Sequence, residues 1–505
     1  MKTERKLCAA DSAIELADAD GNLRHCPICG NSQFKNDAVI KDLHLQSCTE
    51  CTLGFLNPQP QARQEKSQIA SRLDRTGAKT YLDMIAHYRP PAGGNLLVVG
   101  SGSGEFQIEA QNRGLNATVI DAGRVPTGEI ENEDLPAGSF DVCILSDCLD
   151  ESRNPAHLLR VVHQLLKPEG ILLVTLPILD HWFARSMAYR TELQERRLFY
   201  FNFNTLQNLL FVTNFNRVLV QPDPSNNRNT GRLVAIASRQ EPAPVRKLSI
   251  IMPVFNEART FHQVIELLLL KKVDGLNIEI IIVESNSRDG TREVVLKYKD
   301  HPRVKVVLED RPRGKGHAVR AGFVHATGDF VLIQDADLEY DMADYDALLE
   351  PLRLGKTAFV LGTRHDNNGL MKMRHFADQP VMGAMLNFGH IFFCTLLNIL
   401  YRQRLNDPFT MYKVFRRDCL FGLKFQCNRF DFDYELVIKL LRKGYAPVEI
   451  PVNYQSRSFN EGKKVSLFRD PMSWFRALAK FRVQPLNLVQ NVHNANRASS
   501  NADIY

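Results

Sequence analysis

Short apolar runs alternate with amphipathic stretches through two long parts of the chain. In the first part, the runs predict strands at Leu96–Val99, Ala117–Ile120, Val142–Leu145 and Ile171–Leu176. In the second part, they predict strands at Ser249–Pro253, Glu279–Val283, Val304–Leu308 and Phe330–Ile333. Apolar residues at helical spacing lie between them, for example at Leu158, Leu159, Val162 and Leu165. Strands that alternate with helices predict an α/β fold with two parallel sheets covered by helices.

Changes in composition suggest where the domains begin and end. A turn-rich segment with paired cysteines comes first, and Glu241-Pro-Ala-Pro244 reads as a proline-stiffened linker between the two strand–helix alternations. The last fifteen residues are polar and read as a disordered tail. We therefore expect five segments: residues 22–60, 61–240, 241–247, 248–490 and 491–505.

Composition and charge exclude several classes of protein. With 505 residues, 44% apolar and 24% charged, the chain is an ordinary globular protein. A net charge of +6 without a dense basic run gives no reason to expect a nucleic-acid partner. Met1 to Asp20 lacks an apolar signal-peptide core, and the longest apolar runs, 265–270 and 391–397, fall short of the roughly 20 residues of a membrane span. We expect a cytoplasmic protein, soluble or peripheral to the membrane, in a reducing compartment.

Four of the ten cysteines form a regular pattern. Cys26, Cys29, Cys48 and Cys51 give C-x₂-C-x₁₈-C-x₂-C, a spacing that can present four thiolates tetrahedrally to Zn²⁺. Because all four ligands come from the protein, such a zinc would be structural. The alternatives are free cysteines in chance register, or a redox pair, for which the βαβ surroundings are missing.

A glycine-rich turn follows the first strand of the first sheet. Gly100, Gly102 and Gly104 would let a ligand approach the backbone at the beginning of a helix. Asp121 follows the next strand, where a carboxylate can hold ribose hydroxyls. With the preceding cysteines, Gly138-Ser-Phe-Asp-Val and Leu165-Leu-Lys-Pro-Glu-Gly170, residues 22–238 resemble zinc-ribbon class I methyltransferases. The resemblance implies a Rossmann-like sheet that binds S-adenosylmethionine through these residues.

Several residues depart from the methyltransferase pattern. Val98 stands where that family usually has an acidic residue, and only eighteen residues separate Asp121 from Phe140, fewer than the family uses to cover the adenine. Asp150-Glu151 replaces a usual Glu-His pair. Three interpretations therefore stay open: an active methyltransferase that modifies a sugar or its precursor, an inactive scaffold, and a module that docks the chain onto other proteins.

The strand at Phe330–Ile333 leads directly into a cluster of carboxylates. Asp335, Asp337 and Glu339 follow it, and Lys315 lies just upstream between two glycines. Carboxylate oxygens suit Mg²⁺ or Mn²⁺, which complete their coordination with water and substrate phosphates. A lysine beside them suits a diphosphate. The cluster predicts a site for a divalent metal and a nucleotide-sugar.

Other charged residues also follow predicted strands, and ligands of doubly wound sheets bind beyond these strand ends. The segment resembles a family 2 glycosyltransferase of GT-A fold, of the polyprenyl (dolichol) phosphate sugar synthase branch. The resemblance rests on Pro253-Val-Phe-Asn-Glu257, Ser287-Arg-Asp-Gly-Thr291, Gly314-Lys-Gly316, Asp335-Ala-Asp337-Leu-Glu339-Tyr-Asp341, Gly362-Thr-Arg364, Asp407-Pro-Phe-Thr-Met-Tyr-Lys413 and Glu461-Gly-Lys-Lys464. It covers residues 248 to about 480 and implies inverting transfer of a sugar from a nucleotide-sugar.

The resemblance implies roles for individual residues. Asp335 and Asp337 would bind the metal, with Glu339 as a third ligand, and Lys315 would offset charge on the leaving diphosphate. The base and ribose would be held by Pro253, Glu257, Glu284 and Asp289. Paired aspartates are commoner at Glu284-Ser285, so the donor nucleotide stays open.

The acceptor decides which further residues act. A phosphate acceptor is already anionic and needs cations, for which Arg364, Arg374, Arg457 and Lys463 are the candidates. A sugar hydroxyl of a surface glycan would instead need a carboxylate base. Asp433 is the first candidate for that base, with Asp431 and Glu435 beside it, although capping of a helix explains Asp433 equally well.

Two segments could contact a membrane. Residues 382–400 are apolar and aromatic, and residues 466–482 place Trp and Phe on one side and Arg and Lys on the other. Packing on the domain's own core, or a subunit interface, explains the same pattern. The oligomeric state, the sugar and the acceptor stay open.

Overall fold

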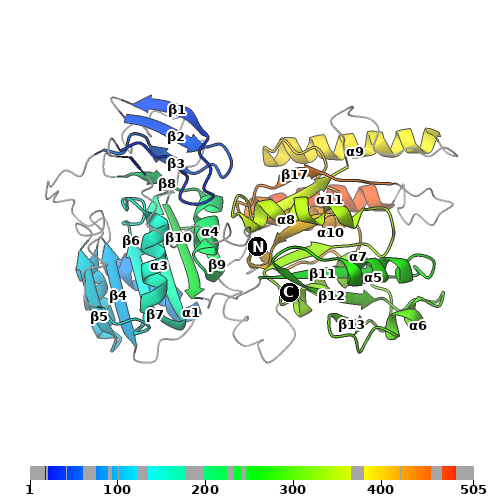
Figure 1. The fold of residues 1–505 in the computed structure, drawn as a ribbon, viewed down its shortest axis with the longest axis horizontal. Helices are drawn as coiled ribbons and strands as arrows, with labels where there is room; N and C mark the ends of the chain where they lie inside the picture. The colour runs from blue at the N-terminus through cyan, green and yellow to red at the C-terminus, as the bar shows by residue number, and fades with distance from the viewer. Residues whose placement is uncertain are drawn as a thin grey trace, which may run out of the picture. The chain divides into compact units, whose positions relative to one another are not determined.

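A computed structural model shows how these segments fold. It describes residues 17–18, 21–40, 43–60, 75–88, 94–100, 102–121, 135–177, 197–223, 232–239, 246–364, 380–420, 423–455 and 469–484. The chain forms two compact units, Met1–Glu241 and Pro242–Tyr505 (Figure 1). The expected tail at 491–505 lies outside the described residues. The finer expected boundaries stay predictions.

The paired cysteines adjoin a small antiparallel sheet of unit 1, in which Cys48 ends β2 (Leu43–Cys48) and the other three lie in the turns beside the strands. Its strand order is β1-β2-β3-β8, with bounds Phe34–Ile40, Leu43–Cys48, Gly54–Leu56 and Phe199–Tyr200. The last of these strands comes from far along the chain and pairs Phe199 with Phe55. The cysteine-bearing segment and the following sheet also share one hydrophobic cluster. The sequence did not indicate that β8 joins this sheet, because a strand of two residues is too short to show a periodic pattern.

A six-stranded sheet forms the rest of unit 1, in the order β5-β4-β6-β7-β10-β9. In that order the strands span Asn116–Asp121, Asn95–Gly100, Phe140–Ser146, Leu166–Pro177, Arg232–Arg239 and Phe215–Pro222. The helices are α1 (Arg75–Tyr88), α2 (Ser103–Asn112), α3 (Pro155–Leu165) and α4 (Phe203–Val212). The first four strands are parallel, as expected, but β10 runs antiparallel to both of its neighbours.

Unit 2 is built on a seven-stranded sheet in the order β13-β12-β11-β14-β16-β15-β17. In that order the strands span Val304–Leu308, Leu276–Glu284, Arg246–Val254, Phe330–Ile333, Lys413–Arg416, Phe359–Thr363 and Val448–Pro451. The four strands from β13 to β14 are parallel, whereas β16 is antiparallel to both neighbours. The α/β class is confirmed, but the expectation of purely parallel sheets is wrong at β10 and β16. The pattern of apolar residues predicts where a strand lies but not whether it runs parallel or antiparallel to its neighbours.

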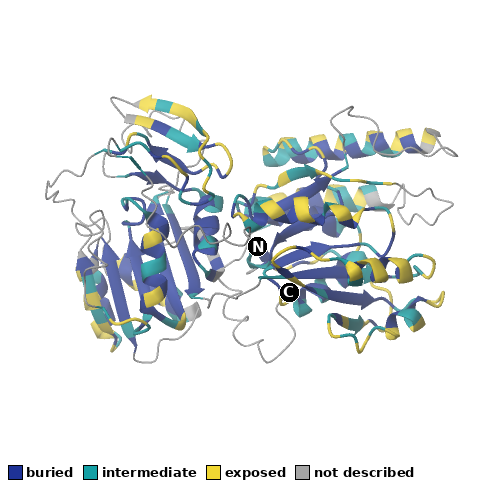
Figure 2. Ribbon diagram, viewed as in Figure 1, coloured by how far each residue is buried: buried dark blue, intermediate teal, exposed yellow. Residues whose placement is uncertain are grey.

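Helices surround this sheet. They are α5 (Phe261–Leu270), α6 (Thr291–Leu296), α7 (Lys315–His325), α8 (Tyr345–Arg353), α9 (Pro380–Tyr401), α10 (Asp431–Arg442) and α11 (Arg469–Val483), with short 3₁₀ turns at Met342–Asp344 and Arg417–Leu420. Strands β14, β16 and β15 are buried along their whole length (Figure 2). An apolar cluster joins them to α7, α9, α10 and α11.

Helix α9 differs from the sequence expectation. Its stretch Gly383–Tyr401 is long and apolar enough to cross a membrane by length and composition, and only 28% of that stretch is buried. The sequence did not indicate a helix of this length and hydropathy, because Gly383, Asn387 and His390 divide its apolar residues into short runs. The expectation that no stretch reaches the length of a span is therefore wrong for this helix.

Candidate active site

The carboxyl ends of three parallel strands meet at one edge of the unit 2 sheet. β11 lies between β12 and β14, and its Ile251 is in register with Ile333 of β14. The backbone of Gln334 continues this contact by donating to the carbonyl of Ile251 at 3.0 Å. The loops that follow the three strands therefore lie side by side, where ligands of doubly wound sheets bind.

A cavity of about 710 Å³ opens at this edge. Eight of the residues expected in the site line it: Pro253, Glu257, Lys315, Asp335, Asp337, Glu339, Arg364 and Asp433. Glu284 and Asp289 are not among the lining residues. Arg374, Arg457 and Lys463 lie outside the described residues. The structure thus brings these eight residues together from five separate segments of the chain.

Lys315 and Asp335 form an ion pair in the wall of this cavity. The Lys315 ammonium lies 2.6 Å from one Asp335 oxygen and 2.7 Å from the other. Burial alone would lower the pKa of Lys315, but the carboxylates of Asp335 and Asp433 raise it. The lysine is therefore a fixed positive charge rather than a base.

The glycines around Lys315 are required by close packing. Gly314 has φ +104°, and a Cβ there would lie 2.4 Å from the backbone oxygen of Asn428. A Cβ on Gly316 would lie 2.4 Å from Cβ of Phe432. The lysine at the start of α7 is thus held directly against the segment that leads into α10.

The other two carboxylates of the cluster are held separately. Asp337 accepts the backbone N–H of Glu339 at 3.1 Å, and Tyr454 donates its hydroxyl to Glu339 at 2.9 Å. Among the described residues, the three carboxylates are not gathered closely enough to form a complete metal cage. They still fit Mg²⁺ or Mn²⁺, which usually take only one or two carboxylates and use substrate phosphates for the rest.

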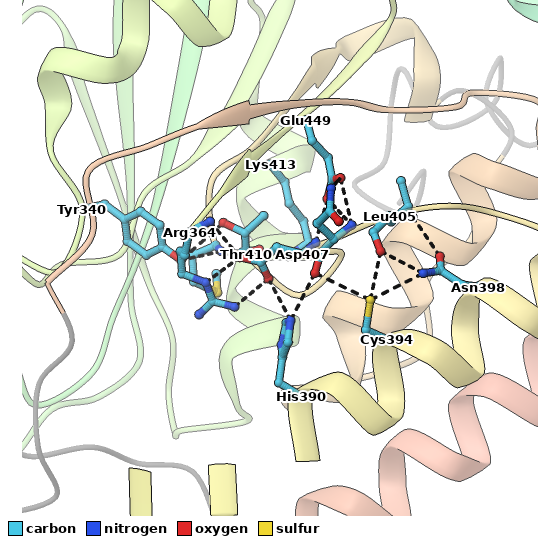
Figure 3. A network of polar contacts seen from close by, with 12 residues as sticks. Tyr340, Arg364, His390, Cys394, Asn398, Leu405, Asp407, Thr410, Lys413 and Glu449 are labelled. Carbon is cyan, nitrogen blue, oxygen red and sulfur yellow. Dashed lines mark hydrogen bonds and ion pairs between the residues drawn. The ribbon is translucent and has the colours of Figure 1, made fainter. Parts of the chain in front are cut away.

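Arg364 reaches the cavity wall from a rigid, buried position. Its guanidinium donates to both oxygens of Asp407 at 2.7 and 2.8 Å, and its backbone N–H donates to the same carboxylate (Figure 3). Burial would raise the pKa of Asp407, but Arg364 and then His390 hold it well below its usual range. The side chains of Arg364 and Asp407 are 6% and 0% exposed. The arginine is therefore oriented before any ligand arrives.

Asp433 is paired with a second buried cation. Lys413, whose side chain is fully buried, donates to Asp433 at 2.9 Å. Burial lowers the pKa of Lys413, although the Asp433 carboxylate opposes this effect. Asp433 lies in the first turn of α10, but no side-chain cap bond marks the helix start. The ion pair thus explains its position better than the capping alternative does.

Glu435 and Asp431 are placed differently from Asp433. Glu435 is fully buried and accepts the backbone N–H groups of Gln426 and Cys427 together with Lys439. Asp431 accepts the backbone N–H of Arg429 at 3.1 Å. Neither lines the cavity. Their contacts organise the loop before α10, so Asp433 is the stronger candidate for a base.

Glu284 and Asp289 shape the loop after β12. Glu284 is fully buried, pairs with Arg292 and accepts two backbone N–H groups of its own loop. Burial alone would raise the pKa of Asp289, but hydrogen bonds from Thr291 and from the backbone of Ala258 lower it. These bonds tie the loop after β12 to the loop after β11. A direct role of either residue in nucleoside binding stays a prediction.

One end of the cavity is apolar and aromatic. Its wall includes Met385, Leu386, Phe393, Phe409, Tyr434 and Trp474, contributed by α9, α10, α11 and the loop before β16. Tyr434 stacks on Phe409 with ring centroids 4.2 Å apart, and Trp474 stacks on the same tyrosine at 5.5 Å. The cavity therefore has a charged half at the strand ends and an apolar half between the helices.

The sequence interpretation missed several residues that line the cavity. They are Ser285, Arg313, His390, Arg429 and Tyr454. Ser285 adjoins a strand end and was noted only as a departure from the family pattern. Arg313 follows the predicted strand Val304–Leu308 but was not given a role. The remaining three lie on loops or a helix away from the predicted strands, where periodicity gives no indication of what they face.

The four patterned cysteines of unit 1 are gathered at one point. Their Sγ atoms all lie within 4.8 Å of one another, with Cys26 and Cys51 at 3.4 Å and Cys29 and Cys48 at 3.5 Å. Tetrahedral zinc with Zn–S bonds of about 2.3 Å separates its sulfurs by about 3.8 Å. The observed Sγ–Sγ distances of 3.4 and 3.5 Å are too long for disulfides, in which the sulfurs lie about 2.05 Å apart. The donor set fits a closed structural Zn²⁺ site.

We expect the purified chain to carry about one zinc per molecule, measurable by elemental analysis. Cys48→Ser should lower the zinc content severalfold and destabilise unit 1, because a structural site contributes to folding directly. Cys427→Ser, in unit 2, is the matched control and should keep the metal. Wild-type protein that remains zinc-free after expression with added zinc would contradict this expectation.

The glycine-rich turn of unit 1 lies at the carboxyl end of β4. Gly100 is paired in register with Asp121 at the end of β5, as a cofactor site would require. A Cβ on Gly100 would lie 2.1 Å from the backbone oxygen of Ser146, whereas Gly104 has open space around it. Gly102, with φ +74°, directly precedes α2. These four residues are thus placed as expected for a ligand above the turn, and their role stays a prediction.

Comparison with known proteins gives two domain matches. Residues 249–421 match the model of glycosyl transferase family 2, and residues 62–220 match a methyltransferase domain model. A dolichyl-phosphate beta-glucosyltransferase of Trichomonas vaginalis is 29% identical over 46% of this chain and 72% of its own. A dolichol-phosphate mannosyltransferase of Pyrococcus furiosus is 26% identical over 43% of this chain and 59% of its own, so the match spans less than two thirds of that relative.

Among solved structures, the glucosyl-3-phosphoglycerate synthase of Mycobacterium tuberculosis, in complex with Mn²⁺, UDP-glucose and phosphoglyceric acid, is similar at 21% identity. The alignment covers 48% of this chain and 81% of that one, with a TM-score of 0.34. The family models locate the domains more clearly. Unit 2 contains a family 2 glycosyltransferase domain, and unit 1 contains a methyltransferase domain.

Proposed function

We propose that the chain transfers one sugar, with inversion, from a nucleotide-sugar to a polyprenyl phosphate or a related surface-glycan acceptor, with Mg²⁺ or Mn²⁺. The observation that carries this proposal is one cavity of unit 2 that has both a charged half and an apolar half. A nucleotide-sugar matches the charged half, and an isoprenoid chain matches the aromatic half. The dolichyl-phosphate transferases among the relatives support this choice of acceptor.

The charged half suits a diphosphate leaving group. Asp335 and Asp337 would hold the metal, which supplies positive charge to the departing diphosphate. Lys315, which lies 2.6 Å from Asp335, would offset negative charge on the same diphosphate. Positioned charges of this kind are usually the largest contribution to catalysis of such transfers.

A phosphate acceptor needs cations near its phosphate group more than it needs a general base. A phosphate oxygen is already anionic at neutral pH, so it can attack the sugar without losing a proton. Arg364 presents a guanidinium at the wall in an orientation fixed by Asp407, and Arg429 lines the same cavity. Such groups bind phosphate through paired N–H donors. Asp433 would act as a base only if the acceptor were a hydroxyl.

An exposed apolar surface adjoins the apolar half of the cavity. On α9, Val381, Met385, Phe388, Phe392 and Ile399 are 82, 54, 73, 45 and 69% exposed. Phe392 contacts Phe475 of α11 with ring centroids 5.8 Å apart, so the surface continues onto that helix. Met385 belongs both to this surface and to the cavity wall. We propose that the surface lies on a membrane and admits the lipid acceptor from it.

Sedimentation with phospholipid vesicles checks this surface. Phe388→Ser should lower the partition coefficient of the chain onto vesicles about fivefold or more, because it removes a large apolar side chain from the contact. Leu270→Ser is the matched control, since Leu270 is 76% exposed on α5, which does not line the cavity. Equal binding of both variants and the wild type would rule out this surface as the contact.

A transfer assay with defined acceptors tests the proposed function. The chain is incubated with labelled UDP- and GDP-sugars, Mn²⁺ and either a polyprenyl phosphate, a small water-soluble phosphate or a free sugar. We expect label in the polyprenyl phosphate product, with the configuration at the anomeric carbon inverted relative to the donor. Transfer only to the small phosphate or only to the sugar would contradict the lipid acceptor, and no transfer with any donor would contradict the activity itself.

A second activity is favoured by the match of residues 62–220 to a methyltransferase domain. We propose that unit 1 binds S-adenosylmethionine at the turn formed by Gly100, Gly102 and Gly104, beside Asp121. Isothermal titration with S-adenosylmethionine distinguishes the alternatives. Saturable binding supports a bifunctional enzyme that methylates a sugar or its precursor. The absence of binding leaves a scaffold or a docking module.

A further inference from the structure

A second cavity of unit 2, of about 320 Å³, is separate from the candidate active site and shares no lining residue with it. It forms where three helices end: α9 at Tyr401, α10 at Arg442 and α11 at Val483. Its volume lies at the lower end of the range for small-molecule sites, roughly 300–1,000 Å³. Three of its lining residues are arginines, namely Arg402, Arg442 and Arg482.

The lining of this cavity is strongly positive. Among the described residues, it includes three guanidinium groups and no Asp or Glu side chain. The negative ends of three helix dipoles, at about half a charge each, offset only part of that positive charge. Burial lowers the pKa of Arg442, Tyr401 opposes this effect, and the positive charge of Arg482 lowers the pKa further. An anion bound among the guanidinium groups would relieve their mutual repulsion.

Stabilisation of helix ends explains only part of this arrangement. Arginines near the end of a helix can bind its last carbonyl groups. Arg442 does so, because it donates to the backbone carbonyls of Phe481 and Gln484 at 2.5 and 2.6 Å. These two bonds hold Arg442 in place at the end of α11. They do not explain why Arg402 and Arg482 line the same cavity, where like charges repel one another.

Two of the three helices also carry the apolar surface proposed to lie on a membrane. The helices α9 and α11 contact each other at Phe392 and Phe475, and again where the Tyr401 hydroxyl donates to the carbonyl of Leu478 at 2.9 Å. Residues in the first half of each helix line the active-site cavity, and residues at the end of each line the arginine cavity. Both helices therefore lead from one cavity to the other.

The exposed side of α9 leads directly to the arginine cavity. Exposed side chains recur every three or four residues along this helix, at Val381, Met385, Phe388, Phe392, Thr395 and Ile399. Arg402, which is also exposed, follows Ile399 by three residues. On α11, Val483 is 79% exposed and adjoins Arg482. Apolar side chains thus border a positively charged cavity, as they would where acyl chains meet headgroup phosphates.

We propose that this cavity binds the phosphate group of an anionic phospholipid through Arg402, Arg442 and Arg482. Guanidinium groups bind phosphate oxygens through paired N–H donors. The exposed apolar residues beside the cavity favour a lipid over a soluble phosphate compound, because only a lipid brings acyl chains to cover them. The site rests on the membrane contact proposed for α9, and it adds a preference for one lipid class, which an apolar surface alone does not provide.

Sedimentation of the full chain with vesicles of phosphatidylcholine, with and without phosphatidylglycerol, tests this site. The wild type should partition at least about tenfold more strongly onto the vesicles that contain phosphatidylglycerol. Arg482→Gln and Arg402→Gln should each lower this advantage about fivefold, which is the effect of one arginine near an anionic membrane. Both variants should bind pure phosphatidylcholine vesicles as the wild type does. The thermal unfolding midpoint shows that each variant is folded.

Arg476→Gln is the matched control, because Arg476 is exposed on the same helix as Arg482 but does not line the cavity. It should keep nearly the full preference for phosphatidylglycerol. Attraction to the basic surface as a whole would instead weaken equally in both variants. Equal losses in Arg476→Gln and Arg482→Gln, or equal binding of the wild type to both kinds of vesicle, would overturn the inference.

Isothermal titration with glycerol 3-phosphate, without vesicles, distinguishes the two sources of phosphate. Tight binding that Arg482→Gln removes, in a chain without a preference for phosphatidylglycerol, would assign the cavity to a soluble phosphate and overturn the lipid. A lipid preference that depends on Arg482, without any sugar transfer, would contradict only the proposed function. Transfer to a polyprenyl phosphate without the lipid preference would contradict only this inference.

Discussion

Asp337→Asn is expected to lower the rate of sugar transfer by about a hundredfold to a thousandfold, the range found when one positioned electrostatic group is removed from an active site. Asp337 lines the cavity, is 7% exposed and lies two residues from Asp335. Its neutral amide counterpart keeps the shape of the side chain but removes the charge that would hold the metal. Steady-state kinetics over a range of Mn²⁺ concentrations measures the effect.

The metal dependence distinguishes loss of a ligand from loss of folding. Asp337→Asn should need a higher Mn²⁺ concentration for half-maximal rate, with little change in its thermal midpoint. Asp346→Asn is the matched control, because Asp346 is 54% exposed and pairs with Lys271. It should retain wild-type kinetics. Full activity of Asp337→Asn at low Mn²⁺ would remove Asp337 from the metal site.

Asp407→Ala is expected to lower the free energy of unfolding of unit 2 by about 3–5 kcal/mol. The reason is that Arg364 would keep a buried charge without its partner, which is the costly case among ion-pair deletions. The substitution also frees the guanidinium that the acceptor phosphate would meet, so transfer should fall together with stability. Denaturant unfolding followed by tryptophan fluorescence measures the change, since the only described tryptophan of unit 2, Trp474, packs against its core cluster.

Acid titration provides a second measurement on the same ion pair. Arg364 holds the pKa of Asp407 below its usual value, so the stabilisation is fully present above the unfolded pKa of about 3.9. It is lost as the pH falls through the lower folded-state pKa. Asp407→Ala should lack this part of the acid dependence. Asp346→Ala, in an exposed pair, should change stability by no more than about 0.5 kcal/mol. Equal stability losses in the two variants would contradict the assigned role of burial.

The sequence was sufficient where each strand is a short apolar run followed by a turn. Val304–Leu308 and Phe330–Ile333 have the predicted bounds, and the carboxylates after the second of these strands lie in the cavity. The paired cysteines also gathered as their spacing predicts. In these cases residues close together in the sequence determine the strand bounds and the cysteine site, so a local sequence pattern is enough to predict them.

Contacts between distant segments were not predictable in this way. Asp407 holds Arg364 across 43 positions, and Glu309 reaches Ser285 across 24. Glu284 resembles a ligand-binding residue in sequence, but Arg292 and its own loop neutralise it. The direction of β16 depends on how the chain returns to the sheet. Such pairings depend on the packing of the whole unit, which hydrophobic periodicity does not describe.

In the proposed function, one cavity binds both a nucleotide-sugar and an isoprenoid chain. The most direct measurement is the ratio of kcat/KM for a long polyprenyl phosphate to that for a short, water-soluble prenyl phosphate, with the donor and Mn²⁺ held constant in detergent. We predict a ratio of at least about tenfold for the wild type, which falls in Trp474→Ser because that tryptophan lines the apolar half. Equal kcat/KM for the two acceptors, unchanged in Trp474→Ser, would show that the apolar half does not bind the isoprenoid chain.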